Sequence, residues 1–373
     1  MSTHQLTLKP ISEVAEFLKN LIPANIPDTY ALEPIFENVA SEENTRSGVI
    51  AFRDFLHLFF DRLISDGHLF ATPPKKPSSM TDYPFLHNIT NLLVDIGYHS
   101  KLTESGDSLW ITEIPSCTAF IDENGKKKNP KISDSNMIEC LRFLSLCGFV
   151  FTSADSKAKT LGIKKTQPLG VSYPSNPVML TGLKALSIAD IELRTGRRYW
   201  NDHNLLRCDY RLLKREDTDI RDILKDFLRP LPDEIQEFAL KLHQRYTDMG
   251  MTCSIRMLGD VNFAYADTSK TRRVLSPTDI YSLSVWQFSI SLKNGYCLFI
   301  RPKKTDKYAG IIEKFPLYLQ EKIAKGYGCD RKRNECCQGG CQGICIPLDD
   351  SILNIAKDIE IWLDNEMPNS LRK

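Results

Sequence analysis

The stretch YSLSVWQFSISLKNGYCLFIR, residues 281–301, decides how the C-terminal part of the chain folds. Apolar side chains alternate with small or polar ones along much of residues 281–292 and again along 296–301, which is typical of β-strands. Asn294-Gly295 lies between the two runs and favours a two-residue hairpin turn. We therefore predict two antiparallel strands joined at Gly295.

The segments on either side of this hairpin complete a small α+β domain. Residues 251–258 and 261–266 are predicted strands, and a helix from Asp233 to Gly250 precedes them. After the hairpin, a helix begins near Asp306, is interrupted by Pro316 and resumes to about Lys325. The order predicts an α-β4-α single-sheet domain over residues 234–373, closed by an amphipathic C-terminal helix. This order resembles the small single-sheet domains of the YjbR and DUF1801 groups, many of whose members have no assigned activity.

The N-terminal part is predicted to be mainly helical. Apolar stripes at helical spacing cover residues 49–65, 82–96 and 136–147, and Gly67, Gly97 or Gly148 follows each stripe. A helix over 178–193 and a strand over 205–213 come next. Prolines at positions 230 and 232 mark the domain boundary. The predicted parts are thus a helical segment at 1–78 and a tandem region at 79–227.

The helix over 82–96 is followed by two short strands around the turn Ser105-Gly106-Asp107. This arrangement resembles the recognition helix and wing of winged-helix domains, over about residues 49–171, and the helix over 136–147 begins a looser second copy. The resemblance implies DNA binding. However, the helix over 82–96 contains no Lys or Arg, and contacts with phosphates dominate nucleic-acid affinity. We therefore do not favour DNA as the partner, although basic clusters occur at 126–131, 157–165 and 194–198.

Composition limits the class of protein. The chain has 373 residues, a formal net charge of +1 and 11 cysteines. It has no apolar run long enough to span a membrane, and Met1 to Pro10 lacks the layout of a secretion signal. An odd number of cysteines fits a reducing compartment. We therefore expect a cytoplasmic protein that makes no membrane contact.

The segment 328–345 contains five cysteines and few apolar residues. Four thiolates can hold a structural Zn²⁺ in a tetrahedron, and that set is Cys329, Cys337, Cys341 and Cys345. Cys297 or Cys253 is expected to replace one of them if the sheet edge is near. An iron–sulfur cluster, free thiols and disulfides are the alternative states. A zinc ion with four thiolates would be structural, because no coordination position stays open.

The C-terminal sheet provides a second candidate site. Tyr281, Trp286, Phe288, Tyr296 and Phe299 can line either a pocket or an ordinary core. If one face of the sheet is open, a small-molecule site is expected there, with Arg256, Arg301 or Glu313 at its rim.

The residues from Gln320 through Cys341-Gln342-Gly343 to Asn365 resemble uncharacterised cytoplasmic proteins of anaerobic Gram-positive bacteria. The resemblance covers most of the chain and implies no activity.

Three functions are compatible with these observations. We favour a non-enzymatic binding or regulatory protein, either a protein scaffold that can homodimerise or a small-ligand sensor. The first alternative is a DNA-binding transcription regulator that uses the winged-helix elements. The second is a thiol-dependent enzyme that uses Cys336, Cys337 or Cys341.

Overall fold

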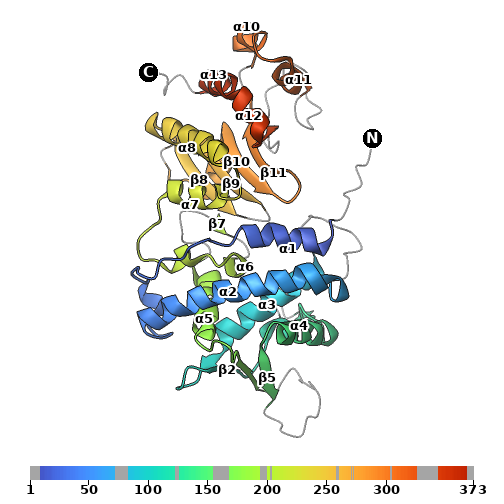
Figure 1. The fold of residues 1–373 in the computed structure, drawn as a ribbon. Helices are drawn as coiled ribbons and strands as arrows, with labels where there is room; N and C mark the ends of the chain where they lie inside the picture. Colours follow the sequence, from blue (N-terminus) through green and yellow to red (C-terminus); the bar gives the residue numbers. More distant parts are fainter. Residues whose placement is uncertain are drawn as a thin grey trace. The chain divides into compact units, whose positions relative to one another are not determined.

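The computed structural model of the protein describes residues 9–71, 83–121, 126–153, 168–193, 200–201, 204–257, 260–269, 271, 273–302, 305–325 and 343–367. The chain forms two compact units. Unit 1 contains residues 1–196 and 203–217, and unit 2 contains residues 197–202 and 218–373. Each unit combines helices with antiparallel strands, so the predicted α+β class is confirmed (Figure 1). In the described parts of the chain, no helix has both the length and the apolarity that a bilayer crossing requires.

Unit 1 is built around two long helices that pack on a third. Helix α2 packs on α1 and α5, and α3 packs on α4 and α5. The helices of the unit are α1 (Ile11–Asn20), α2 (Glu42–Asp66), α3 (Pro84–His99), α4 (Asp134–Leu146), α5 (Met179–Glu192) and α6 (Asn204–Arg207). The apolar stripes predicted for residues 49–65, 82–96, 136–147 and 178–193 therefore lie in helices.

The four-stranded sheet of unit 1 joins two similar substructures. It has the order β1-β2-β6-β5, and all neighbours are antiparallel. Helix α3 precedes the pair β1–β2 and α4 precedes the pair β5–β6, so the predicted repetition of helix and strands is present. The strands are β1 (Lys101–Leu102), β2 (Ser108–Ile111), β5 (Val150–Ser153) and β6 (Leu169–Ser172), and a separate two-stranded sheet consists of β3 (Phe120–Ile121) and β4 (Lys127–Lys128).

Unit 2 contains one six-stranded sheet of order β12-β11-β10-β9-β8-β7. The four central strands are the predicted ones, and two edge strands that the sequence analysis missed extend them, with β7 parallel to β8. The strands are β7 (Trp200–Asn201), β8 (Thr252–Met257), β9 (Val261–Ala266), β10 (Trp286–Ser291), β11 (Gly295–Ile300) and β12 (Ile344–Pro347). The helices are α7 (Ile220–Leu228), α8 (Asp233–Asp248), α9 (Pro277–Leu283), α10 (Ala309–Ile312), α11 (Leu317–Lys325), α12 (Asp350–Asn354) and α13 (Ala356–Glu366).

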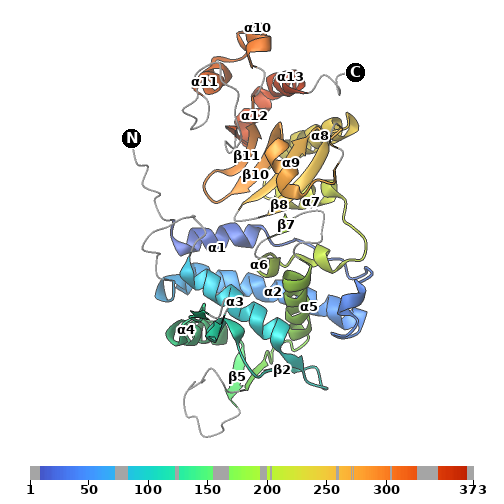
Figure 2. The same ribbon diagram turned by 180° about the vertical axis from the view of Figure 1, so that it is seen from behind.

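The two faces of this sheet differ in character. One face carries Trp286 and Phe263, which pack against Tyr246 of α8 and Phe227 of α7 at ring-centroid distances of 5.5 and 5.9 Å. This face is the apolar core of unit 2. Helix α9 lies against β8 and β9 on the opposite side of the sheet from α8 (Figure 2).

Three local predictions are wrong. Residues 205–213 lie in α6 and in a 3₁₀ turn at Tyr210–Leu213 instead of a strand. All of them are buried, and no strand in the described part of the chain pairs with them. The first part of residues 281–292 belongs to helix α9, and β10 begins only at Trp286. The hairpin loop has three residues, because Ser291 pairs with Gly295 and Gly295 has a φ of 64°.

Candidate functional site

The face of the unit 2 sheet opposite the apolar core carries small and polar side chains, most of which are buried. Register places Ala264 between Ser254 and Gln287 in one row of this face. In the next row Asn262 lies between Arg256 and Ser289. We call this set the polar cluster: Ser254, Arg256, Asn262, Ala264, Gln287 and Ser289. Gln287 is fully buried, and Ser254 and Asn262 are each 4% exposed.

Several polar atoms of the cluster have no hydrogen-bond partner within the described residues. They are Ser254 Oγ, Arg256 Nε, Asn262 Oδ1 and both Oε1 and Nε2 of Gln287. Buried polar groups are nearly always paired with protein, water or a ligand, and an unpaired one costs about 1–3 kcal/mol. The polar cluster therefore has the donors and acceptors that a polar guest would need.

Tyr281 of α9 contacts two arginine side chains at the same face. The guanidinium carbon of Arg256 lies 4.4 Å from the centre of its ring, and that of Arg301 lies 4.8 Å from it. Arg301 is 5% exposed, and its Nη1 donates to the carbonyl oxygen of Tyr281 at 2.7 Å. One aromatic ring thus positions two guanidinium groups beside the cluster, which favours an anionic guest.

A capping box positions α9 and therefore Tyr281. Ser276 Oγ accepts from the backbone N–H of Asp279 at 3.2 Å, and Asp279 Oδ2 accepts from the backbone N–H of Ser276 at 3.0 Å. Pro277 occupies the first turn, where its missing N–H is not needed. The motif Ser276-Pro277-Thr278-Asp279 is the sequence signal that could have identified this helix.

The aromatic residues predicted to line a pocket are divided between the two faces. Trp286 and Phe288 lie two positions apart in β10 and therefore share the apolar face. Tyr296 pairs with Ile290, which is on the same face. Phe299 pairs with Gln287 on the polar face. Of the residues expected at the rim of a small-molecule site, Arg256 and Arg301 lie near Tyr281 at this face, whereas Glu313 follows α10 and is exposed. The small-molecule site itself stays a prediction.

Gln287, Asn262 and Ser254 were missed by the sequence analysis. In the run Trp286-Gln-Phe-Ser-Ile-Ser291 the polar positions match those of a strand with one solvated face. The signal that could have found them is the register of three strands, in which polar residues flank the small Ala264.

The predicted cysteine site is only partly within the described residues. Cys329, Cys337 and Cys341 lie outside them, as do Cys336 and two of the basic clusters, so zinc stays a prediction. Cys345 lies in strand β12, not in a loop, and its Sγ is 3.1 Å from Sγ of Cys297 in β11. Cys253 pairs with Tyr265 on the other face and cannot join them. Within the described ranges, no three side chains of His, Cys, Asp or Glu are close enough together to hold a metal ion.

Helix α3, the helix expected to contact DNA, is largely buried. Eleven of its 16 residues are buried, and it packs against α4 and α5. A helix that reads DNA must insert one face into the major groove. The burial of α3 therefore counts against recognition by this helix, although Lys126, Lys127, Lys128 and Lys131 of the basic loop are exposed.

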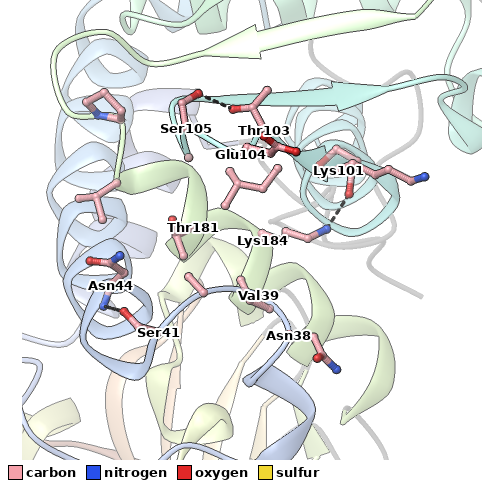
Figure 3. A pocket seen from close by; sticks show the side chains of 16 residues that line it. Asn38, Val39, Ser41, Asn44, Lys101, Thr103, Glu104, Ser105, Thr181 and Lys184 are labelled. Carbon is pink, nitrogen blue, oxygen red and sulfur yellow. Dashed lines mark hydrogen bonds between the residues drawn. The ribbon is translucent and has the colours of Figure 1, made fainter.

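Unit 1 has a separate open pocket of about 760 Å³ between α2, α5 and the β1–β2 turn (Figure 3). Two of its polar side chains bond to backbone groups that also line the pocket. Ser41 Oγ accepts from the backbone N–H of Asn44 at 3.2 Å, and Lys184 Nζ donates to the carbonyl oxygen of Ser100 at 2.6 Å. The buried Oγ of Ser100 lacks a partner in the described part of the chain. Because this is a single atom, the pocket is a weaker candidate than the polar cluster.

The chemistry available at the polar cluster is that of binding. Amide and hydroxyl groups donate and accept hydrogen bonds, and guanidinium groups donate without exchanging a proton near neutral pH. Phe299 and Tyr281 add apolar surface to the same face. Comparison of the chain with protein-family models, with curated proteins and with solved structures finds no match.

Proposed function

We propose that unit 2 binds a small polar anion at the polar cluster and that the protein is a non-enzymatic ligand sensor. The observation that carries this proposal is Gln287, which is fully buried while both polar atoms of its amide have no partner among the described residues. A carboxylate or phosphate ligand would accept from Nε2 of Gln287, and a hydroxyl or amide of the ligand would donate to Oε1.

Charge supports an anion over a neutral ligand. Two guanidinium groups lie within 5 Å of one ring centre, at 4.4 and 4.8 Å. The described residues provide no carboxylate within ion-pairing distance of Arg256, whose Nε is buried and unpaired. An anion beside Arg256 would accept from Nε of this residue, a donor that the described protein groups leave without a partner.

The test is a thermal-unfolding series on the full-length protein with inorganic phosphate, acetate and succinate as probes, together with native mass spectrometry of the purified chain. We expect one probe class to raise the melting temperature, because a ligand at 100 times its Kd stabilises by about 2.7 kcal/mol. Arg256→Met, which keeps the aliphatic stem, should abolish the shift. Arg221→Met is the matched control, because Arg221 is exposed on α7, a helix that packs on the other face of the sheet.

Two results would contradict the proposal. One is the absence of both a copurified ligand and a shift with any probe. The other is an Arg256→Met protein that responds as the unaltered chain does, which would place the binding elsewhere.

For unit 1 we propose that the two substructures of helix and paired strands are winged-helix-like elements that act as a scaffold. The burial of α3 supports contacts within the protein over contacts with DNA. The exposed basic residues at 126–128 are the feature on which the DNA-binding alternative depends.

A further inference from the structure

Cys297 and Cys345 form a thiol pair on neighbouring strands. Cys297 pairs with Pro347, and Cys345 pairs with Phe299, so the two cysteines are diagonal neighbours on one face of the sheet. Their sulfur atoms are 3.1 Å apart, which is within S–H···S hydrogen-bonding distance. Diagonal neighbours of an antiparallel pair are close enough for their side chains to meet, and the separation of these sulfurs is about 1 Å longer than a disulfide bond.

The two thiols differ in access to solvent. Cys297 is 1% exposed, whereas Cys345 is half-buried and lies nearer to solvent. Lys322 places a positive charge beside Cys345, because its Nζ donates to the carbonyl oxygen of Cys345 at 2.9 Å. Cys345 is therefore the thiol that a small oxidant can reach first.

We propose that Cys297 and Cys345 are a redox-modification site that forms a reversible intramolecular disulfide with a low-molecular-weight disulfide as the oxidant. Cys345 is the attacking thiol and Cys297 the resolving one. This site is independent of the anion-binding proposal, because it requires neither Gln287 nor Arg256.

The reaction proceeds in two exchanges. The thiolate of Cys345 attacks one sulfur of the oxidant, the sulfur–sulfur bond of the oxidant breaks, and one small thiolate leaves and takes up a proton. Cys297 then releases its proton to solvent, and its sulfur attacks the sulfur of Cys345. The mixed disulfide breaks and the second small thiolate leaves. In total, two protein thiols lose two electrons and one disulfide is reduced to two thiols.

The location gives the bond a structural consequence. It would tie the edge strand β12 to β11 and close a loop whose ends are 48 positions apart, which includes α10 and α11. Cys297 also lies next to Ser289 of the polar cluster in the strand register. Oxidation would therefore restrain the β11–β12 edge of the sheet. The same sheet carries the proposed ligand site on β8, β9 and β10.

The test uses the full-length protein, purified under reducing conditions and incubated with defined ratios of glutathione disulfide to glutathione. After acid quenching and alkylation, we expect peptide mass spectrometry to find the Cys297–Cys345 cross-link. Among the seven described cysteines, the number that alkylate should fall by two, and dithiothreitol should restore it. Cys345→Ser should abolish the cross-link. Cys297→Ser should convert it into a glutathione adduct on Cys345.

Cys253→Ser is the matched control, because Cys253 lies in the same sheet on the opposite face and its loss should leave the yield of the cross-link unchanged. Should Cys297→Ser fail to fold, the unaltered chain and Cys345→Ser still decide the question. Three results would overturn the proposal: a glutathione adduct on Cys345 without a cross-link in the unaltered chain, a cross-link from Cys345 to a different cysteine, or copurified zinc that protects both thiols until it is chelated.

Discussion

Buried polar side chains occur on both faces of the unit 2 sheet, and each face has polar atoms without a partner among the described residues, for example Trp286 Nε1 and Tyr296 Oη on the apolar face. On the apolar face, His243 Nδ1 lies 2.8 Å from the hydroxyl of Tyr265, and burial lowers the pKa of His243. On the polar face, Gln287 is equally enclosed, and neither polar atom of its amide has a partner among the described residues. Two such atoms in one buried side chain are the basis of the binding proposal.

Gln287 can be tested through stability in the absence of added ligand. Gln287→Met keeps the volume of the side chain and removes both unpaired atoms, so the free energy of unfolding should stay the same or rise by about 1–2 kcal/mol. Urea denaturation of the full-length protein, followed by circular dichroism, measures this change.

The control is the same substitution at Gln236, where Nε2 donates to the carbonyl oxygen of Leu231 at 2.7 Å and helps to hold the turn between α7 and α8. Gln236→Met should lower the free energy of unfolding by about 1 kcal/mol. A larger loss for Gln287→Met than for Gln236→Met would mean that Gln287 is satisfied by internal contacts, which would remove the main support for the binding site.

At the scale of elements, α2 and α5 approach each other most closely where two glycines face one another. A Cβ added to Gly48 would lie 2.5 Å from the backbone nitrogen of Gly182, and one added to Gly182 would lie 2.1 Å from the carbonyl oxygen of Gly48. Both neighbouring atoms belong to backbone that cannot rotate away. The crossing of these helices therefore depends on the absence of both side chains.

Gly48→Ala and Gly182→Ala should each lower the free energy of unfolding by about 3 kcal/mol or more, because the helices must separate to admit the methyl group. Gly310→Ala in α10 is the control, since a Cβ there meets nothing within 4 Å and alanine favours a helix. Thermal unfolding of the three variants measures the difference. Equal stabilities for Gly48→Ala and Gly310→Ala would show that the helices adjust without cost.

Two other glycines show how far the helices of unit 1 could be predicted from the sequence. Gly148 ends α4 with a φ of 100°, as a glycine after an apolar stripe predicts. Gly97 follows a similar stripe but lies inside α3, where an added Cβ would lie 2.1 Å from Ser187 Oγ of α5. The periodicity of a stripe is a local property and was sufficient to find the helices. The contacts that keep Gly97 helical come from a helix about ninety residues away, and no local pattern contains them.

The same distinction between local patterns and long-range contacts decides which parts of the candidate site could be predicted. Arg256 and Arg301 could be assigned to the sheet face from the spacing of their strands, and they lie there. The burial of Gln287 depends on the pairing of β8, β9 and β10, which no local pattern contains. Helix α9 lies on the same side of the sheet, and its last residues, 281–283, were predicted as the start of a strand. The proximity of Cys297 to Cys345 likewise depends on β12, which pairs with β11 only once the intervening helices have formed.

At the scale of the whole molecule, the chain passes from unit 1 to unit 2 and back before it finally remains in unit 2. Residues 203–217 return to unit 1, where Leu205, Leu206, Leu212 and Leu213 are buried. Backbone bonds fix this return segment, since the N–H of Glu33 donates to the oxygen of Leu213 at 2.9 Å and the N–H of Arg215 donates to that of Ala31 at 3.0 Å. Unit 1 is therefore not complete at residue 196.

A fragment of residues 1–217 should fold cooperatively, whereas a fragment of residues 1–196 should not. The shorter fragment loses four buried leucines, which together contribute about 6–12 kcal/mol of burial free energy. That amount is comparable to the entire stability of a typical domain, about 5–15 kcal/mol. Circular dichroism and thermal unfolding of the two fragments measure the difference in stability.

Leu213→Ala in the longer fragment should give an intermediate stability, because it removes one of the four side chains and keeps the rest of the segment. The prediction is wrong if the fragment 1–196 unfolds as cooperatively as the fragment 1–217 and at the same temperature. In that case residues 203–217 would contact unit 1 without stabilising it.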